Sequence, residues 1–269
     1  MPIARTPNVE LSYERRGNGA PLLLIMGMSG THLHWGEPFL SELEPSFDVV
    51  AYDHRGVGKS SRVEAPFTIA QLADDAAALM AQLGWDSAHV VGISMGGMVA
   101  QELAVRHPER LRSLTLGCTY AGGAEQRLTE PAVITELMQS WSSGDREQAI
   151  RAGFAVNVSA RYAAEPEHYA GFRRIALALP VAIPVIMEQM RAISGHDTSQ
   201  RLGEVRVPTL VIHGTEDRML PAENARWIAS AIPGARLELM DGVGHLFFWE
   251  RPAQSAALIG EIAAAAQPA

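Results

Sequence analysis

The sequence contains a single cysteine, Cys118, and no long apolar run. One cysteine cannot form an intrachain disulfide, so a reducing compartment is allowed. No apolar run approaches the ~18 residues of a transmembrane helix. Residues 1–5 open no apolar core of a signal peptide. These absences predict a cytoplasmic protein that has no membrane partner.

Charged residues are also few. They make up 19% of the chain, and the formal net charge is −8. A chain with this negative balance is a poor ligand for nucleic acid or for an anionic membrane surface. No His-x-x-x-His motif or comparable ligand cluster is present, so we expect no metal and no cofactor. The expected partner is a small molecule, and a homodimer is allowed because the sequence does not fix the number of subunits.

The chain does contain an alternation of strand-like and helix-like segments. Its 269 residues, 47% of them hydrophobic, are enough to bury one large α/β core. Helical patterns include residues 68–82, where Thr68 and Gln71 form a capping box. Residues 9–15 alternate and end at Gly17-Asn18-Gly19, which predicts an edge hairpin. Apolar runs typical of strands covered on both faces occupy 21–26, 47–52, 88–91, 111–118, 207–213 and 235–240.

This alternation lapses between residues 120 and 202, where the pattern is helical and no clear strand appears. The segment is too long for an ordinary loop. We therefore divide the chain into an α/β core, residues 1–119 and 203–269, and a helical cap, residues 120–202. Most aromatic and methionine side chains of the cap should pack inside it. A minority should face the active site, and we expect Trp141 and Met187 among them.

The stretch that says most about function is Gly92-Ile93-Ser94-Met95-Gly96, which matches G-x-S-x-G. It lies between a predicted strand and a helix predicted to begin at Met95. A serine on so sharp a strand-to-helix turn is forced outward, so its hydroxyl meets solvent. The helix N-terminus behind it supplies free N–H groups and a partial positive charge. A bare match occurs by chance in loops, but this context indicates a nucleophile.

The loop at residues 53–60, which ends in Gly-Lys-Ser, looks like a phosphate-binding loop and fails both tests for one. A Walker A motif requires glycine at the position of Asp53. A dinucleotide-binding fingerprint requires glycine at the position of Ser61. We therefore interpret this segment as a loop that crosses the end of the sheet.

A serine hydroxyl is a weak nucleophile and needs a base, for which histidine is best suited at neutral pH. Of nine histidines, His245 lies in a glycine-flanked loop after the last predicted strand. The exits of parallel strands share one edge of a sheet, so His245 and Ser94 should lie on that edge. Asp217 follows another strand and is the expected acid that orients the base, with Glu216 as the alternative.

Together these motifs resemble those of α/β-hydrolase-fold serine hydrolases, over essentially the full length of the chain. The serine–acid–histidine order of Ser94, Asp217 and His245 is the order expected of that family. The sequence is similar to small capped esterases, enol-lactonases, anthracycline-type methyl esterases and cofactor-free haloperoxidases. The resemblance implies a mostly parallel eight-stranded sheet flanked by helices, with a helical cap inserted. The matching segments are 26–28, 53–60, 92–97, 213–217 and 244–245.

The resemblance also assigns roles around the serine. The backbone N–H groups of Met28 and Met95 would form the oxyanion hole. Many relatives carry His-Gly where this chain has Met26-Gly27, but backbone donors do not require an imidazole. Met28 and Trp35 are expected to line the floor of the substrate pocket. Core packing is the alternative for Trp35.

The function expected from these residues is hydrolysis of a carboxylic ester or lactone of a small-to-medium hydrophobic substrate. The reaction would pass through an acyl-enzyme on Ser94. Two alternatives use the same triad: perhydrolysis with halide oxidation, and hydrolysis of a C–C bond. A third belongs to another class, a ligand-binding protein on a hydrolase fold with little turnover.

Overall fold

The computed structural model describes residues 1–266, which contain one sheet of eight strands in the order β1-β2-β4-β3-β5-β6-β7-β8. Neighbouring strands from β4 through β3 to β8 are parallel, while β1 and β2 join antiparallel at one side. The predicted mostly parallel eight-stranded sheet is confirmed. The strands are β1 (Ile3–Arg5), β2 (Glu10–Arg16), β3 (Ala20–Ile25), β4 (Phe47–Tyr52), β5 (Ala88–Ile93), β6 (Leu111–Gly117), β7 (Thr209–Gly214) and β8 (Arg236–Met240).

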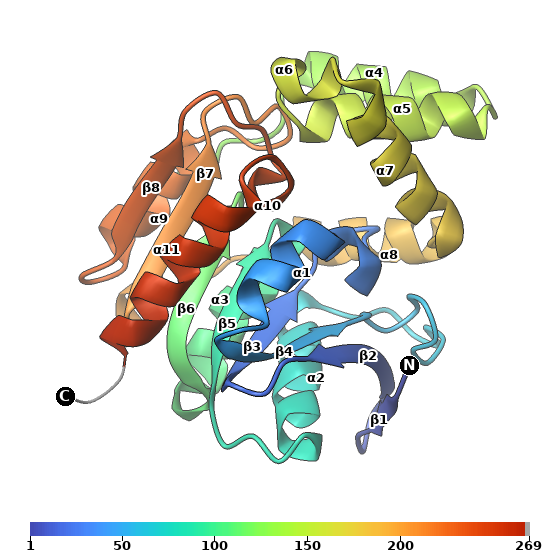
Figure 1. Ribbon diagram of the computed structural model, residues 1–269. Coiled ribbons are helices and arrows are strands. Elements are labelled where there is room, and N and C mark those ends of the chain that lie inside the picture. The colour runs from blue at the N-terminus through green and yellow to red at the C-terminus, as the bar shows by residue number, and fades with distance from the viewer. Residues whose placement is uncertain (267–269) are drawn as a thin grey trace.

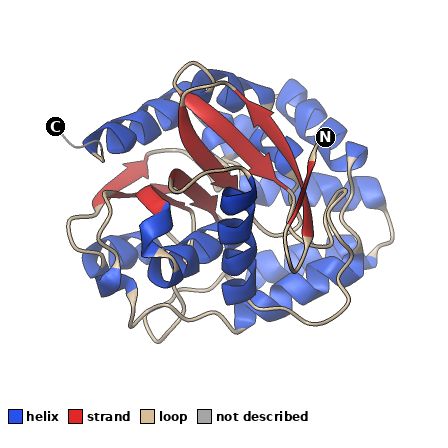
Figure 2. Cartoon of the chain, turned by 90° about the horizontal axis from the view of Figure 1, so that it is seen from below, coloured by secondary structure: helices blue, strands red, loops and turns tan. Residues whose placement is uncertain are grey.

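Helices cover both faces of this sheet, as the view along it in Figure 2 shows. One hydrophobic cluster includes side chains of α2, α3 and α9, and a second includes side chains of α1, α10 and α11. Every residue of β4, β5 and β7 is buried, because two covered faces leave no solvent side for a polar alternation. These helices are α1 (Glu37–Leu43), α2 (Ile69–Gln82), α3 (Met95–Arg106), α9 (Glu223–Ala231), α10 (Phe247–Glu250) and α11 (Pro252–Ala265).

The start of α2 follows the predicted capping box. The Thr68 hydroxyl accepts from the Gln71 N–H at 3.2 Å, and the Gln71 side chain accepts from the Thr68 N–H at 2.9 Å. Helix α1 begins at Glu37. A short 3₁₀ turn over His32–Trp35 and a left-handed Gly36, with φ of 74°, precede it.

Strand β2 pairs antiparallel with β1 at the edge of the sheet, but the turn at Gly17-Asn18-Gly19, from which an edge hairpin is predicted, does not close one. Strand β2 pairs with β1 on one side and with β4 on the other, whereas β3 follows the turn but lies beyond β4. The glycines of the turn serve this crossing. A Cβ on Gly17 would lie 2.1 Å from the Phe47 carbonyl oxygen, and one on Gly19 would lie 2.0 Å from that of Ser46. The chain thus passes close over the start of β4 instead of folding back on itself.

The segment between β6 and β7 contains five α-helices, which we call the inserted helices. Figure 1 shows α4 to α7 above the sheet, with α8 returning toward it. In residues 1–266 no single helix meets the length and hydropathy needed to cross a membrane, although α7 and α8 meet that test as a pair bent by 103°. The inserted helices are α4 (Pro131–Ser142), α5 (Arg146–Asn157), α6 (Ala160–Ala163), α7 (Pro166–Ala178) and α8 (Ile183–Ser194).

Candidate active site

Ser94 is the single residue between strand β5 and helix α3. Its φ of 56° and ψ of −123° are strained for a residue with a side chain. The surrounding structure holds it there, because its N–H donates to the Gly117 carbonyl at 2.9 Å and its carbonyl accepts from the Thr119 hydroxyl at 2.8 Å. The side chain is partly exposed. The sharp turn expected from the motif is therefore present.

The glycines on either side allow this turn to pack tightly. A Cβ on Gly92 would lie 2.2 Å from the Gly96 carbonyl oxygen, and one on Gly96 would lie 2.0 Å from that of Ile25. No real side chain tolerates such distances. The loop after β3 also comes close, because a Cβ on Gly27 would lie 3.1 Å from Cβ of Ser94. The predicted oxyanion loop thus lies directly against the predicted nucleophile.

His245 and Asp217 come from the loops after β8 and β7 and are joined by a hydrogen bond. His245 Nδ1 lies 2.7 Å from Asp217 Oδ2. The other carboxylate oxygen accepts from the N–H groups of Met219 at 2.8 Å and Leu220 at 2.9 Å. Since the carboxylate only accepts, Nδ1 carries the proton and Nε2 is left for a second partner. This is the arrangement that a general base requires.

The environment keeps Asp217 ionised. Burial of its side chain by itself raises the pKa of Asp217, but the charge of His245 and hydrogen bonds from His213 and His245 outweigh burial and hold that pKa below its usual range. Glu216, the alternative acid, is exposed. The geometry therefore favours Asp217 as the partner of His245.

The structure brings two of the three predicted triad residues into contact and the third only to the same edge of the sheet. Within residues 1–266 the Ser94 hydroxyl makes no hydrogen bond to His245. Catalytic hydrogen bonds are often long without substrate and tighten in the complex. The role of Ser94 thus stays a prediction that chemistry has to test.

Sequence reasoning passed over His213, which it placed inside a strand. His213 is fully buried, and its Nε2 lies 3.0 Å from Asp217 Oδ2 and 2.9 Å from the Leu220 carbonyl oxygen. Neither oxygen can donate, so Nε2 carries the proton. The one Nε2 proton of His213 is therefore shared between the Leu220 carbonyl and the Asp217 oxygen that also accepts from His245. The signal in the sequence was a histidine on the strand four residues before the acid.

Glu250 is a second residue that sequence reasoning missed. It is buried in α10, and its carboxylate accepts from the Gly244 N–H at 2.8 Å, the Ser159 N–H at 2.8 Å and the Ser159 hydroxyl at 2.5 Å. The Leu246 N–H also donates to the Asn157 carbonyl at 2.8 Å. These bonds fix both sides of His245 to the inserted helices.

The loop at residues 53–60 contacts the predicted oxyanion loop and the residues that follow it, and holds them in place. His54 Nε2 lies 2.9 Å from the Met26 carbonyl oxygen, and Asp53 accepts from the His32 N–H at 2.7 Å. Burial lowers the pKa of His54. Within the described residues, the N–H groups of Met28 and Met95 donate to no protein acceptor. Two donors beside Ser94 are thus available for an oxyanion.

Cys118 lies beside the His245–Asp217 pair and has a φ of 42°. Its sulfur, one oxygen of Asp217 and one nitrogen of His245 lie within 4.8 Å of one another, a spacing that could hold a metal ion. Burial raises the pKa of the Cys118 thiol well above its usual value, and a metal needs the thiolate. His245 and Asp217 are already bonded to each other, so the residues present fit a triad better than a metal centre.

The residues predicted to contact substrate differ in their exposure. Trp35 is fully buried, stacks on Phe39 at 5.8 Å and packs at a tilt against Phe248 at 4.8 Å, centroid to centroid, which favours the core-packing alternative. Trp141 on α4 and Met187 on α8 are 45% and 57% exposed. The rest of the protein leaves about half of each side chain uncovered, so the contact of Trp141 and Met187 with substrate stays a prediction.

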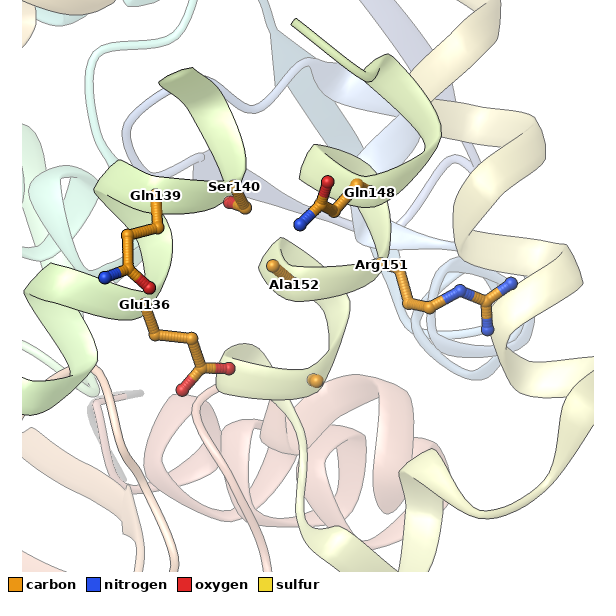
Figure 3. A pocket seen from close by; sticks show the side chains of 7 residues that line it. Glu136, Gln139, Ser140, Gln148, Arg151 and Ala152 are labelled. Atoms are coloured by element: carbon orange, nitrogen blue, oxygen red, sulfur yellow. The ribbon is translucent and has the colours of Figure 1, made fainter. Parts of the chain in front are cut away.

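A groove of about 360 Å³ lies between α4 and α5, as Figure 3 shows. Five of its seven lining residues are polar or charged, and it is open to solvent. None of the predicted catalytic residues takes part in it, so it is separate from the candidate active site. The lining residues are Glu136, Gln139, Ser140, Gln148, Arg151, Ala152 and Ala155.

Known proteins match this chain over nearly its whole length. A proposed carbamate hydrolase of Azorhizobium caulinodans is 31% identical over 253 residues, which cover 92% of each chain. A poly(3-hydroxyalkanoate) depolymerase of Ectopseudomonas oleovorans is 32% identical over 248 residues, 89% of this chain and 82% of the relative. The crystal structure of the enol-lactonase of Burkholderia xenovorans superposes with a TM-score of 0.80 and 29% identity, covering 97% of this chain and 99% of that one.

A family model agrees with these relatives. The model for the alpha/beta hydrolase fold matches residues 20–177 and 186–252, which include every predicted catalytic residue. The eight strands form one sheet. The strained serine between β5 and α3 and the histidine–aspartate pair lie at the same edge of this sheet. This chain therefore belongs to the alpha/beta hydrolase fold family.

Proposed function

We propose that this protein is a serine hydrolase that cleaves a carboxylic ester or lactone of a small-to-medium hydrophobic substrate through an acyl-enzyme on Ser94. One observation carries the proposal. A serine held at φ of 56° at a helix N-terminus shares a sheet edge with a histidine whose Nδ1 is bonded to a buried carboxylate. This combination supplies a nucleophile and a base whose tautomer is set.

The first half of the reaction forms the acyl-enzyme. Ser94 Oγ attacks the ester carbonyl carbon while His245 Nε2 takes the hydroxyl proton. The electron pair of the carbonyl moves to oxygen, and the N–H groups of Met28 and Met95 hold the resulting oxyanion. The carbonyl re-forms, the C–O bond to the alcohol breaks, and the proton on His245 goes to the leaving oxygen.

The second half releases the acid. A water molecule gives a proton to His245 and attacks the acyl carbon, and collapse of the intermediate returns the proton to Ser94 Oγ. Asp217 stays ionised throughout and stabilises the imidazolium that forms twice in the cycle. Burial of Asp217 suits this role, since the attraction between the two groups is stronger away from water.

We further propose that the inserted helices, within residues 120–202, act as a cap that selects the substrate. Apolar side chains stand out on two of them at helical spacing: Ile134, Met138 and Trp141 on α4, and Ile183, Met187 and Met190 on α8. Exposed apolar patches of this kind often mark binding surfaces. The relatives named for polyester and lactone substrates support the same substrate class.

The test is turnover of p-nitrophenyl acetate and p-nitrophenyl butyrate by the wild-type protein and by Ser94→Ala. Loss of the nucleophile should lower kcat/KM by at least about 10³-fold. A fluorophosphonate probe should label the wild-type protein at Ser94 and leave Ser94→Ala unlabelled. Equal rates for the two proteins would overturn the mechanism. Peroxide-dependent bromination and C–C bond hydrolysis, measured on the same samples, separate the two related chemistries.

A further inference from the structure

Gln189 joins helix α8 to the predicted oxyanion loop. Its side chain is fully buried, and its Oε1 accepts from the Ser29 N–H at 2.9 Å. Ser29 follows Met28, whose N–H is one of the two predicted oxyanion donors. Ser29 also has a left-handed φ of 59°, which is unfavourable for a serine. This hydrogen bond therefore joins two residues that are 160 positions apart in the sequence, and it holds the strained Ser29 next to the predicted oxyanion donor.

The other half of the same amide group has no partner. The Ser29 N–H needs an acceptor, so it fixes Oε1 on its side and leaves Nε2 with two N–H bonds. Within residues 1–266, Nε2 of Gln189 is buried and makes no hydrogen bond. Buried polar groups are almost always satisfied in native proteins, and each exception calls for an explanation. An acceptor that is not part of the chain would satisfy this one.

The position and chemistry of Nε2 indicate which kind of atom could accept a hydrogen bond from it. The oxyanion loop runs from Gly27, which lies against Ser94, through Met28 to Ser29. Because Oε1 and Nε2 belong to one amide and Oε1 accepts from the Ser29 N–H, Nε2 also lies beside the end of this loop, one residue after Met28. An amide N–H₂ only donates and carries no net charge, so it suits an ether, carbonyl or hydroxyl oxygen.

We propose that Gln189 is a specificity-determining residue, which donates from Nε2 to a second oxygen of the substrate, close to the ester carbonyl. The inference rests on the proposed ester hydrolysis. A substrate that lacks this oxygen leaves the buried amide unpaired. Sites built to donate to a substrate oxygen reject the analogue that lacks it far more strongly than apolar pockets reject a missing methylene.

The experiment compares two pairs of esters that differ only by an oxygen in place of a methylene. p-Nitrophenyl methoxyacetate and p-nitrophenyl butyrate place the oxygen on the acyl side. 2-Methoxyethyl acetate and butyl acetate place it on the alcohol side. The measured quantity is kcat/KM of the oxygen-containing ester divided by kcat/KM of its methylene analogue, for the wild type and for Gln189→Met. The intrinsic reactivity of each ester cancels when this ratio is compared between the two proteins. We expect the substitution to lower the ratio tenfold or more for one of the pairs.

A matched control makes the same chemical change elsewhere on the inserted helices. Gln148→Met on α5, in the separate groove of Figure 3, should leave both ratios unchanged. If Gln189→Met does not fold, as judged by thermal melting, Gln189→Glu at pH 8 replaces it. The ionised Gln189→Glu side chain still accepts from the Ser29 N–H and has no donor, so it should lower the same ratio.

The outcomes separate this inference from the proposed function. If kcat falls by the same factor for both members of each pair, Gln189 only holds Ser29 in place, and the recognition role is overturned. Unchanged ratios and rates would show that a water molecule satisfies Nε2, which also overturns it. If the wild-type protein shows no Ser94-dependent hydrolysis of any of the four esters, the proposed function fails, and this inference fails with it.

Discussion

At the scale of single residues, the buried carboxylate of Asp217 determines how the site is ordered. Its two oxygens accept two backbone N–H groups and the nitrogens of His245 and His213. A carboxylate with this many donors cannot rotate without losing several hydrogen bonds. His213 is thus expected to be a positioning residue, which acts on the reaction through Asp217 without touching substrate.

We predict that His213→Phe lowers kcat for p-nitrophenyl butyrate about tenfold, the equivalent of one hydrogen bond to a charged group. KM should change less than twofold, because His213 lies away from the substrate. Steady-state kinetics, with urea unfolding as a check on the fold, measures both effects. A parallel rise in KM with unchanged kcat would contradict the positioning role.

At the scale of secondary-structure elements, the segment between β6 and β7 is bonded to all three loops of the site. Gln189 of α8 accepts from the oxyanion loop, Thr129 donates to the Met219 carbonyl in the loop of Asp217, and Ser159 bonds to Glu250 beside His245. These bonds run between parts of the chain distant in sequence. The inserted helices therefore help to hold the three loops of the candidate site in place.

Glu250 offers a direct test of this coupling. Glu250→Leu removes the acceptor of the Gly244 and Ser159 N–H groups, and each lost bond to a charged acceptor costs about 1.5–3 kcal/mol. We expect lower stability in urea and a kcat reduced more than tenfold. Glu250→Gln is the matched control, since its Oε1 still accepts from both N–H groups and its amide can donate to the Ser159 hydroxyl. A Leu variant as active as the Gln variant would show that this tie is dispensable.

At the scale of the whole molecule, the packing buries histidines that are far from the site. Burial lowers the pKa of His89 and of His196 to about 4 from the ordinary 6.5. These side chains are neutral in the folded protein at pH 6, while the unfolded chain takes up protons below pH 6.5. The unfolded state then binds more protons, so stability is full above pH 6.5 and falls as the pH drops toward 4.

We predict that the free energy of unfolding decreases steadily between pH 6.5 and pH 4.5. Each such histidine adds a slope of about 1.4 kcal/mol per pH unit in that window. Urea unfolding at pH 7.5, 6.0, 5.0 and 4.5 measures the slope. His89→Gln, which removes one of these groups, should reduce the slope by about 1.4 kcal/mol per pH unit. A free energy of unfolding that does not change with pH in the wild type would contradict the assignment.

The sequence alone determined those features that depend on local chemistry and on strand order. The capping box at Thr68, the buried strands and the turn around Ser94 follow from neighbouring residues. The pairing of Asp217 with His245 follows from a general rule, that the exits of parallel strands share one edge. Each of these predictions needed no knowledge of which surfaces meet.

Tertiary structure decided everything that depends on contacts between distant segments. The turn at Gly17 looked like a hairpin, but β2 pairs with β1 and β4 and not with β3, because β3 and β4 are both apolar and pair inside the sheet. His213, Glu250 and Gln189 carry no local motif, and their roles come from groups 4 to 160 residues away. Burial and hydrogen-bond partners are properties of the packed chain, so only the fold could assign them.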